Sequence, residues 1–296
     1  MKRYVLGLGL AVAVCVGGFF VLTRPVHTDP AQFAAISADP VRGEQVFWAG
    51  GCASCHADAA AEGNARLILS GGRAFATDFG TFYAPNISPD PVSGIGGWSV
   101  ADLDSAMRHG TSPDGRHYYP AFPYTSYVHA SFQDVADLKA FLDTLPPSDR
   151  ANTPHDLGFP FNQRWLMGGW KLINPSGGWV VAGELSSAEA RGRYLVEGLG
   201  HCGECHTPRN VIGARDTTRW LAGGPNPDGK GKIPNITPGA LDWSEGDIAE
   251  YLKSGFTPDY DSVGGSMADV VTNLSHLPDS DRAAIAAYLK RVPALP

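Results

Sequence analysis

The chain begins with an unbroken apolar stretch. Residues 5–22 contain no charged side chain, whereas Lys2 and Arg3 precede them and Arg24 follows. As a helix that rises about 1.5 Å per residue, the stretch is about 27 Å long, close to the thickness of the hydrocarbon core of a bilayer. The pattern predicts a membrane-spanning helix, and the basic residues before it predict a cytoplasmic N-terminus with the rest of the chain across the membrane.

Two interpretations of residues 1–27 compete, a retained membrane anchor and a cleaved signal peptide. The apolar run is long for the core of a signal peptide, and no small-x-small cleavage site follows closely after Leu22. Val14 is a poor match to the small residue expected before a lipidated cysteine at Cys15. We favour a retained anchor, and either interpretation exports the bulk of the chain.

Beyond a polar tether at residues 28–39, helical patterns of apolar residues occur twice in the same order. One begins near residue 40 and the other near residue 190. Trp98-Ser99 and Trp243-Ser244 each open an amphipathic helix that ends before a glycine, with the serine at the N-cap position. Apolar-striped helices then close the two halves at residues 134–146 and 281–293.

Short motifs recur along with these helices. CASCH at residues 52–56 returns as CGECH at 202–206, and PNISP at 85–89 returns as PNITP at 234–238. The two copies of each motif are about 150 positions apart, which indicates an internal repeat. We therefore predict two copies of one domain, at residues 40–146 and 188–296, joined by a linker at residues 147–187.

The repeated five-residue motif indicates covalent attachment of a c-type haem. Two thiols three positions apart can add to the two vinyl groups of one porphyrin, and the histidine that follows becomes the proximal ligand of the iron. A redox CxxC pair or half of a zinc site is disfavoured, because the histidine recurs and the chain has no other cysteine outside its apolar stretch. The motif assigns two covalent haems to Cys52, Cys55, Cys202 and Cys205, and their proximal ligands to His56 and His206.

Composition narrows the class of protein further. Of the 296 residues, 43% are hydrophobic and 18% are charged, which excludes a disordered chain. The formal net charge of −7 gives no indication of a nucleic-acid partner and fits a basic docking patch on a partner protein. The 36 glycines and 23 prolines, many in connecting stretches, favour a loop-rich fold around a prosthetic group.

The linker is too aromatic for a solvated tether, since residues 159–170 contain two phenylalanines and two tryptophans. It can pack into the domain interface and set the geometry between the haems. It can also form a docking surface for a membrane or a protein partner, because exposed aromatic patches usually have one. The sequence leaves both interpretations open.

The order of CxxCH, Pro-Asn-Ile-Ser/Thr-Pro, Trp-Ser-x-x-Asp and a terminal helix resembles the class I cytochrome c fold. More narrowly, it resembles the membrane-anchored cytochrome c subunits of periplasmic dehydrogenases of the alcohol and gluconate type. The resemblance implies an all-α chain with two class I cytochrome c-like domains in tandem after an N-terminal transmembrane helix. It also implies a methionine loop over the distal face of each haem.

The same resemblance implies a role in electron transfer at the bacterial inner membrane, with the haem domains in the periplasm. Electrons would come from a periplasmic dehydrogenase or another redox protein. They would leave to the quinone pool, a terminal oxidase or a soluble cytochrome. A haem enzyme of the peroxidase type, or one that oxidises a small molecule, is the alternative, and a haem-based sensor would need a signalling domain that the sequence does not show.

The two halves differ where the distal ligand is expected. Met267 lies in the loop after the Trp243 helix, where the resemblance places the methionine ligand of the second haem. The same offset that relates Trp243 to Trp98 carries Met267 back to Phe122, which cannot bind iron. The first haem therefore lacks the expected ligand.

Several side chains compete for the sixth position of the first haem. His117, five residues before Phe122, could bind after a modest shift of the loop. His109 closes a helix and His129 lies further along the chain, so both are less attractive, and Met107 matches a leucine of the second half. A further possibility is that Phe122 covers an open position.

Other haem contacts are expected nearby. Arg209 could pair with a propionate, and the carbonyl of Pro208 could accept the imidazole N–H of His206 and fix its tautomer. Asn86 and Asn235 are expected to shape turns or to donate to a propionate, and turn formation is the commoner role of asparagine.

Overall fold

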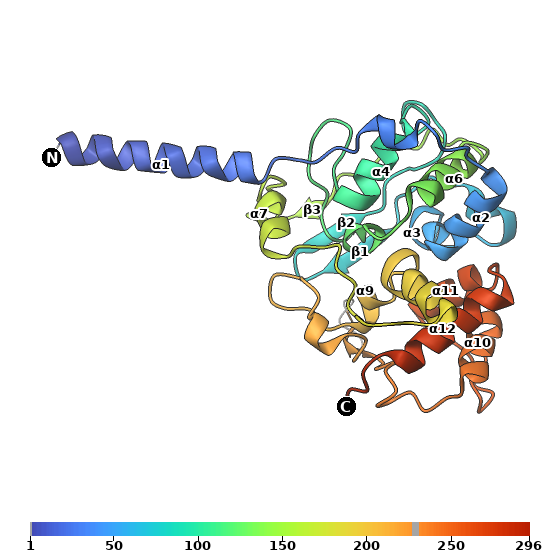
Figure 1. Ribbon diagram of the computed structural model, residues 1–296. Coiled ribbons are helices and arrows are strands. Elements are labelled where there is room, and N and C mark those ends of the chain that lie inside the picture. The colour runs from blue at the N-terminus through green and yellow to red at the C-terminus, as the bar shows by residue number, and fades with distance from the viewer. Residues whose placement is uncertain (1, 227–230) are drawn as a thin grey trace.

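A long N-terminal helix leads into two helical lobes that lie against each other (Figure 1). The computed structural model describes residues 2–226 and 231–296. Helix α1 (Lys2–Leu22) stands clear of the lobes and has no buried residue. Within the described residues it is the one helix long and apolar enough to cross a membrane.

The first lobe follows a short 3-10 turn (Pro30–Phe33). Its helices are α2 (Pro40–Ala49), α3 (Cys52–His56), α4 (Val100–His109), α5 (Tyr124–Tyr127) and α6 (Phe132–Leu142), with a 3-10 turn at Gly63–Leu67. Helix α4 and its counterpart in the second lobe, α10 (Glu245–Ser254), begin with the capping boxes Ser99–Asp102 and Ser244–Asp247 and end at glycines in the left-handed conformation, as the sequence predicts.

The second lobe repeats this order. Its elements are α8 (Ser187–Arg193), which continues as a π-helical turn (Tyr194–Leu199), then α9 (Gly203–His206), a 3-10 turn (Thr217–Arg219), α10 (Glu245–Ser254), α11 (Ser266–Leu274) and α12 (Asp279–Arg291). The terminal helices α6 and α12 each begin two residues before the predicted position.

The chain is mostly helical, but the expectation of an all-α fold missed two small antiparallel sheets. Strands β1 (Ala74–Thr77) and β2 (Gly80–Tyr83) form a hairpin, and β3 (Asp156–Leu157) from the linker pairs with β2. Strands β4 (Gly224–Pro225) and β5 (Lys232–Ile233) form the second sheet. These strands are too short to leave a period-two pattern in the sequence.

In each lobe the first and last long helices cross at a glycine. A Cβ at Gly43 of α2 would lie 2.0 Å from the carbonyl oxygen of Asp137 in α6, and a Cβ at Gly192 of α8 would lie 1.9 Å from that of Ala284 in α12. Only a residue without a side chain allows the two backbones to approach this closely. The matched crossings show that both lobes are built on the same helix pair.

We expect Gly43→Ala and Gly192→Ala to lower the free energy of unfolding by about 1–3 kcal/mol or more, because the added methyl group must push two helices apart. Thermal unfolding of the haem-loaded protein measures this loss. The control is Gly246→Ala in α10, where the nearest neighbour of an added Cβ is the Ser244 hydroxyl at 3.6 Å. Equal melting of the control and the crossing variants would contradict the close-packing account.

The lobes share one connected apolar core, to which Phe47 and Val135 of the first lobe and Leu195 and Ile285 of the second belong. Aromatic side chains also bridge the lobes, and the Trp48 and His276 rings stack at 3.8 Å between centroids. The linker contacts both lobes, through β3 on one side and through Val180 N–H donating to the Glu197 carboxylate on the other. The packing role expected for the linker is thus present in its outer parts.

Candidate haem sites

The first CxxCH motif forms its own short helix, α3, directly after Gly51 in the left-handed conformation (φ 64°). His56 Nδ1 lies 2.8 Å from the carbonyl oxygen of Pro85. A carbonyl can only accept, so Nδ1 carries the proton and Nε2 keeps its lone pair, as an iron ligand requires. The backbone N–H of Gly71 donates to the carbonyl of His56 and ties the following loop to the motif.

The second motif repeats this arrangement in α9. His206 Nδ1 lies 2.9 Å from the carbonyl oxygen of Pro234, and Gly223 N–H donates to the carbonyl of His206. The expectation that Pro208 supplies the acceptor was wrong, because the Pro208 carbonyl accepts from the N–H of Asp216 instead. The proline that opens the repeated Pro-Asn-Ile turn orients the imidazole in both lobes.

Asn86 and Asn235 hold these turns in place, which confirms the turn-forming role. Their side-chain oxygens accept from the N–H groups of Ser88 and Thr237, two residues on. Their side-chain amides donate to the segments that follow the last helix of each lobe, at the carbonyls of Ser148 and Leu295. Each turn is thus held by one hydrogen bond within the turn and by another to the C-terminal segment of its lobe.

None of the five cysteines, all of which lie within the described residues, forms a disulfide. Burial raises the pKa of Cys52 and Cys202 to about 12 and that of Cys55 to about 11, so these thiols are neutral at physiological pH. Among residues 2–226 and 231–296, no group of three His, Cys, Asp or Glu side chains gathers to bind a bare metal ion. Two thiols beside one oriented imidazole therefore fit a covalent haem better than zinc.

The positions expected to carry distal ligands are both half-buried. Met267 lies in the first turn of α11 and packs against the shared core. Phe122 contacts the rings of Tyr118 and Tyr127 at 5.8 Å and 5.7 Å between centroids. The Tyr127 hydroxyl donates to the carbonyl of Gly50 at 2.7 Å, two residues before Cys52. The ring contact with Tyr127 and the hydrogen bond from the Tyr127 hydroxyl thus connect Phe122 to the segment just before the first CxxCH helix.

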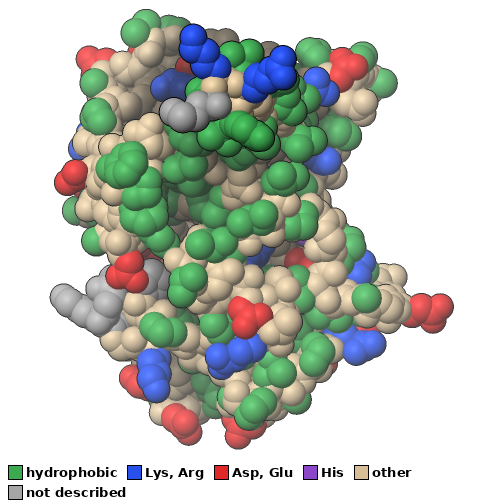
Figure 2. Space-filling view, turned by 90° about the vertical axis from the view of Figure 1, so that its left-hand side faces the viewer, with side chains coloured by type: hydrophobic (Ala, Val, Ile, Leu, Met, Phe, Trp, Pro, Cys, Tyr) green, Lys and Arg blue, Asp and Glu red, His purple; other side chains and the backbone are tan. Residues whose placement is uncertain are grey.

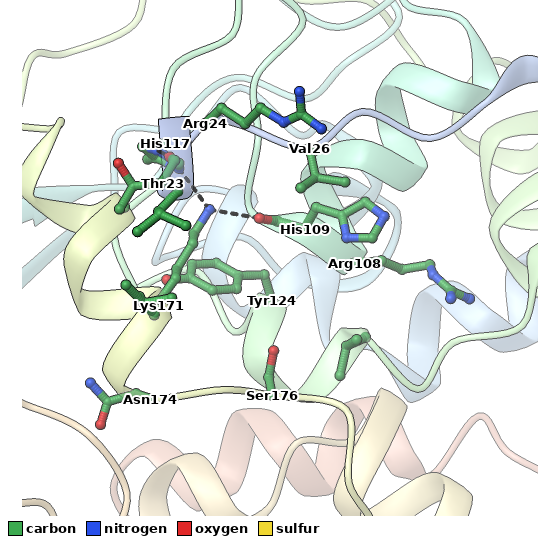
Figure 3. A pocket seen from close by; sticks show the side chains of 14 residues that line it. Thr23, Arg24, Val26, Arg108, His109, His117, Tyr124, Lys171, Asn174 and Ser176 are labelled. Carbon is green, nitrogen blue, oxygen red and sulfur yellow. Dashed lines mark hydrogen bonds between the residues drawn. The ribbon is translucent and has the colours of Figure 1, made fainter. Parts of the chain in front are cut away.

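His117 is buried and engaged at both ring nitrogens (Figure 3). Nε2 lies 2.9 Å from the carbonyl oxygen of Thr23, at the end of α1, and Nδ1 lies 3.1 Å from Nζ of Lys171. Burial lowers the pKa of His117, with a smaller contribution from the Lys171 charge, and burial lowers the pKa of Lys171 to about 8. The prediction of His117 as a distal ligand has no support in this geometry, because neither nitrogen is free.

The less attractive candidates are also placed elsewhere. His109 and His117 line the same cavity of about 380 Å³ between the end of α1, α7 (Leu166–Ile173) and the first lobe. His129 stacks face to face on Trp179 at 3.8 Å. Met107 is buried in the core, as its match with a leucine predicts. None of these contacts favours iron ligation.

Each haem-attachment helix is contacted by the opposite lobe at the same position of its motif. Ser54 Oγ accepts from the side-chain amide of Asn273 in α11 at 2.6 Å. Its counterpart Glu204 accepts from the hydroxyls of Thr125 and Ser126 in α5, both at 3.0 Å. Helices α5 and α11 hold or follow the distal positions of their own lobes. Each lobe thus places its distal segment against the other lobe's CxxCH helix, a signal that sequence reasoning missed.

Glu204 is half-buried between two cations. Burial alone would raise the pKa of its carboxyl, but Arg215 at 3.4 Å and Arg209 at 2.5 Å outweigh this effect and lower the pKa to about 2. Arg209 therefore pairs with a carboxylate of the protein, rather than standing free for a haem propionate as expected. Glu204 holds the CxxCH helix, the Arg209 loop and α5 together.

Asp269 makes the matching interlobe contact on the other side. It pairs with Arg66 at 3.1 Å and with Arg73 at 2.9 Å. Arg73 also donates to the carbonyl of Ser54 within the first CxxCH motif. Because Asp269 is two residues from Met267, the distal segment of the second haem site is fixed to the proximal helix of the first.

We expect Asp269→Asn to lower the free energy of unfolding by about 1–3 kcal/mol, since two half-buried guanidinium groups lose their shared carboxylate. Calorimetry of the haem-loaded protein measures the change. Asp242→Asn, at an exposed position of the same lobe, is the control for removing one negative charge. If the two variants melt alike, the Asp269 ion pairs do not hold the lobes together.

Comparisons with known proteins agree with these sites. The cytochrome c family model matches residues 40–146. A protein of Cereibacter sphaeroides described as "Diheme cytochrome c-type" is 70% identical over 289 residues, which cover 98% of this chain and 97% of that protein. The chain therefore belongs to the dihaem c-type cytochromes, and it carries two c-type haems on its two CxxC motifs.

Cytochrome subunits of dehydrogenases are more distant relatives. The fructose dehydrogenase cytochrome subunit of Gluconobacter japonicus is 37% identical over 92% of this chain and 56% of its own length. The cytochrome c subunit of the quinone-type alcohol dehydrogenase of Gluconobacter oxydans is 37% identical over 97% of this chain and 61% of its own length. The chain thus spans little more than half of these subunits and is related to cytochromes that serve dehydrogenases.

Proposed function

We propose that this chain is a membrane-tethered electron relay, with its haem lobes in the periplasm, that takes electrons from a dehydrogenase or another redox protein and passes them toward the respiratory chain. The observation that carries the proposal is the reciprocal contact of the two CxxCH helices with the opposite lobes at Ser54 and Glu204. Each haem supplies a one-electron carrier when attached, and this contact holds the two attachment helices in a fixed relation.

We assign the residue roles in this proposal from the two CxxCH motifs, the two proline carbonyls and the place of Met267 in the repeat. Cys52, Cys55, Cys202 and Cys205 hold the porphyrins, and His56 and His206 bind iron through Nε2, each oriented by its proline carbonyl. Met267 binds the second iron, and its soft thioether favours the ferrous state. The lobes at residues 40–146 and 188–296 are the two haem domains, and residues 147–187 join them.

For the first haem, we propose that no side chain supplies the sixth ligand. Phe122 occupies the position that corresponds to Met267, and both nitrogens of His117 are engaged. The ring of Phe122 packs against Tyr118 and Tyr127 and would cover the distal face of the first haem with apolar surface. The two sites thus have the same proximal geometry and different distal faces.

The membrane part of the proposal rests on α1. Its length and lack of buried residues fit a retained anchor, and Thr23 at its end accepts from His117, which ties the helix to the first lobe. A cleaved signal peptide would leave His117 without this acceptor. The acceptor of the electrons is the quinone pool, a terminal oxidase or a soluble cytochrome.

Phe122 also favours a second candidate function. An iron without a sixth protein ligand can bind a small molecule, so the first site could act on peroxide or another small substrate. This candidate requires turnover as well as binding, and it predicts peroxide-dependent oxidation of a reduced donor at the first haem.

Purification from membranes in mild detergent separates these functions. The relay predicts that a dehydrogenase co-purifies and that its substrate reduces both haems of the complex. Recovery of the cytochrome alone, with rapid peroxide turnover, would favour the enzyme instead.

A further inference from the structure

The end of α1 packs on α7, a short helix in the middle of the linker. The Phe19 ring lies edge-on to Trp165 at 5.7 Å, and the Phe20 ring lies 6.0 Å from it. Gly169 of α7 faces Phe19 so closely that an added Cβ would lie 3.1 Å from its ring. Helix α7 therefore lies where α1 leaves the lobes, as Figure 1 shows.

The side of α7 away from the lobes is apolar and uncovered. Leu172 and Ile173 are 56% and 68% exposed, and Trp165 and Phe159 are exposed as well. The patch continues onto the second lobe, because the indole N–H of Trp170 donates to the carbonyl of Ile212 at 2.8 Å. We call the following set the exit patch: Phe159, Trp165, Leu172, Ile173, Val211 and Ile212.

The charges of this segment point inward. Arg164 and Lys171 are the only charged side chains between residues 157 and 183. Lys171 Nζ donates to the carbonyls of His109 and Gly110 at 2.6 Å and 2.8 Å, beneath the helix. Arg164 lies over the Tyr119 ring and donates to the carbonyl of His117. The exposed side of the segment is left with apolar and uncharged groups.

Figure 2 views this face nearly along α1. Hydrophobic side chains, those of α1 among them, gather in the middle of the upper half of the view, with charged side chains at its top and edges, whereas the lower half carries acidic and basic side chains interspersed over its face. An apolar surface of this extent is unfavourable in contact with water. Apolar patches with tryptophan are characteristic of the membrane interface.

We propose that the exit patch lies in the headgroup region of the bilayer and holds the two haem lobes at a fixed orientation to the membrane. This inference rests on the proposed retention of α1, because the anchor brings the patch to the lipid surface. An amphipathic element of this kind lies in the membrane plane with its apolar side inserted. The haem lobes would then keep a constant distance from the membrane and a constant orientation to it when they bind the electron donor and acceptor.

A protein partner is the other class of occupant, and the position of the patch argues against it. The patch adjoins the point where α1 enters the membrane, and Trp165, itself 48% exposed, contacts Phe19 and Phe20 of the anchor. A bilayer that contains α1 must come within reach of these side chains. A docked subunit would have to fit between the lobes and the lipid.

The test uses the full haem-loaded chain in aligned lipid multilayers, with the ferric haem signals as orientation probes. Ile173→Asp puts a charge into the patch, and Leu172→Asp/Ile173→Asp is the stronger form. Val41→Asp is the matched control, because Val41 is 70% exposed and lies on α2, on the opposite side of the lobes (Figure 1). Visible spectra and haem content check that each variant is folded.

We expect the EPR signals of the unchanged protein and of Val41→Asp to vary with the angle between the multilayers and the magnetic field, and this variation to be lost in the double variant. Signals without angular dependence in the unchanged protein, or full dependence in the double variant, would overturn the proposal. So would ordering that occurs only after a dehydrogenase is added. Failure of the anchor is a separate result, since the chain would then be absent from the washed membrane fraction.

Discussion

Phe122→Met is expected to give the iron of the first haem a sixth protein ligand. In the unchanged protein, carbon monoxide should bind to one of the two reduced haems, because we propose that only the first iron lacks a sixth protein ligand. A methionine at residue 122 places a thioether where Met267 stands in the other lobe, so the variant should bind no carbon monoxide and should lose its high-spin ferric signal. The reduction potential of the first haem should rise, since sulfur stabilises ferrous iron.

Phe122→Leu provides the control for this prediction. Leucine changes the shape of the distal face without adding a ligand, so carbon monoxide should still bind to one haem per chain. If Phe122→Met leaves the spectrum, the potential and the ligand binding of the first haem unchanged, Phe122 does not lie over the iron.

Met267→Ala should have the opposite effect on the second site. If Met267 is the sixth ligand, as we propose, loss of its thioether opens the second iron, and carbon monoxide should bind to both reduced haems. The reduction potential of the second haem should fall by roughly 0.2 V. This is a fraction of the range of about 0.8 V over which axial ligands set haem potentials. Potentiometric titration with visible spectroscopy measures the shift, and the reduction of the second haem by its electron donor should become less favourable accordingly.

Met107→Leu is the matched control, because Met107 is a buried methionine of the first lobe with a core role. A volume-conserving change costs less than about 1.5 kcal/mol, and both haem spectra should stay as they are. A loss of low-spin character in Met107→Leu, or its retention in Met267→Ala, would reverse the assignment of the ligand.

Local patterns in the sequence predicted much of this structure. The CxxCH motifs, the serine caps of α4 and α10 and the glycines after these helices depend on neighbours within a few residues. The repeat followed from the same motifs returning in the same order. The N-terminal apolar helix needed only its length and the absence of charge.

Contacts between distant segments were not predictable in this way. Pro85 and Pro234 reach their histidines through a folded loop, and the sequence offered the nearby Pro208 instead. The partners of His117, Thr23 and Lys171, come from the anchor and the linker. The pairing of Asp269 with Arg66 and Arg73 requires the two lobes to be docked, and nothing in either repeat marks these residues as partners.

The unequal distal faces are the central claim, and EPR of the unchanged ferric protein tests them most directly. Spin quantitation should give one high-spin haem, at the site of His56 and Phe122, and one low-spin haem, at the site of His206 and Met267, in equal amounts. Two low-spin signals of equal intensity, with no high-spin component, would show that a side chain binds the first iron and would contradict the account.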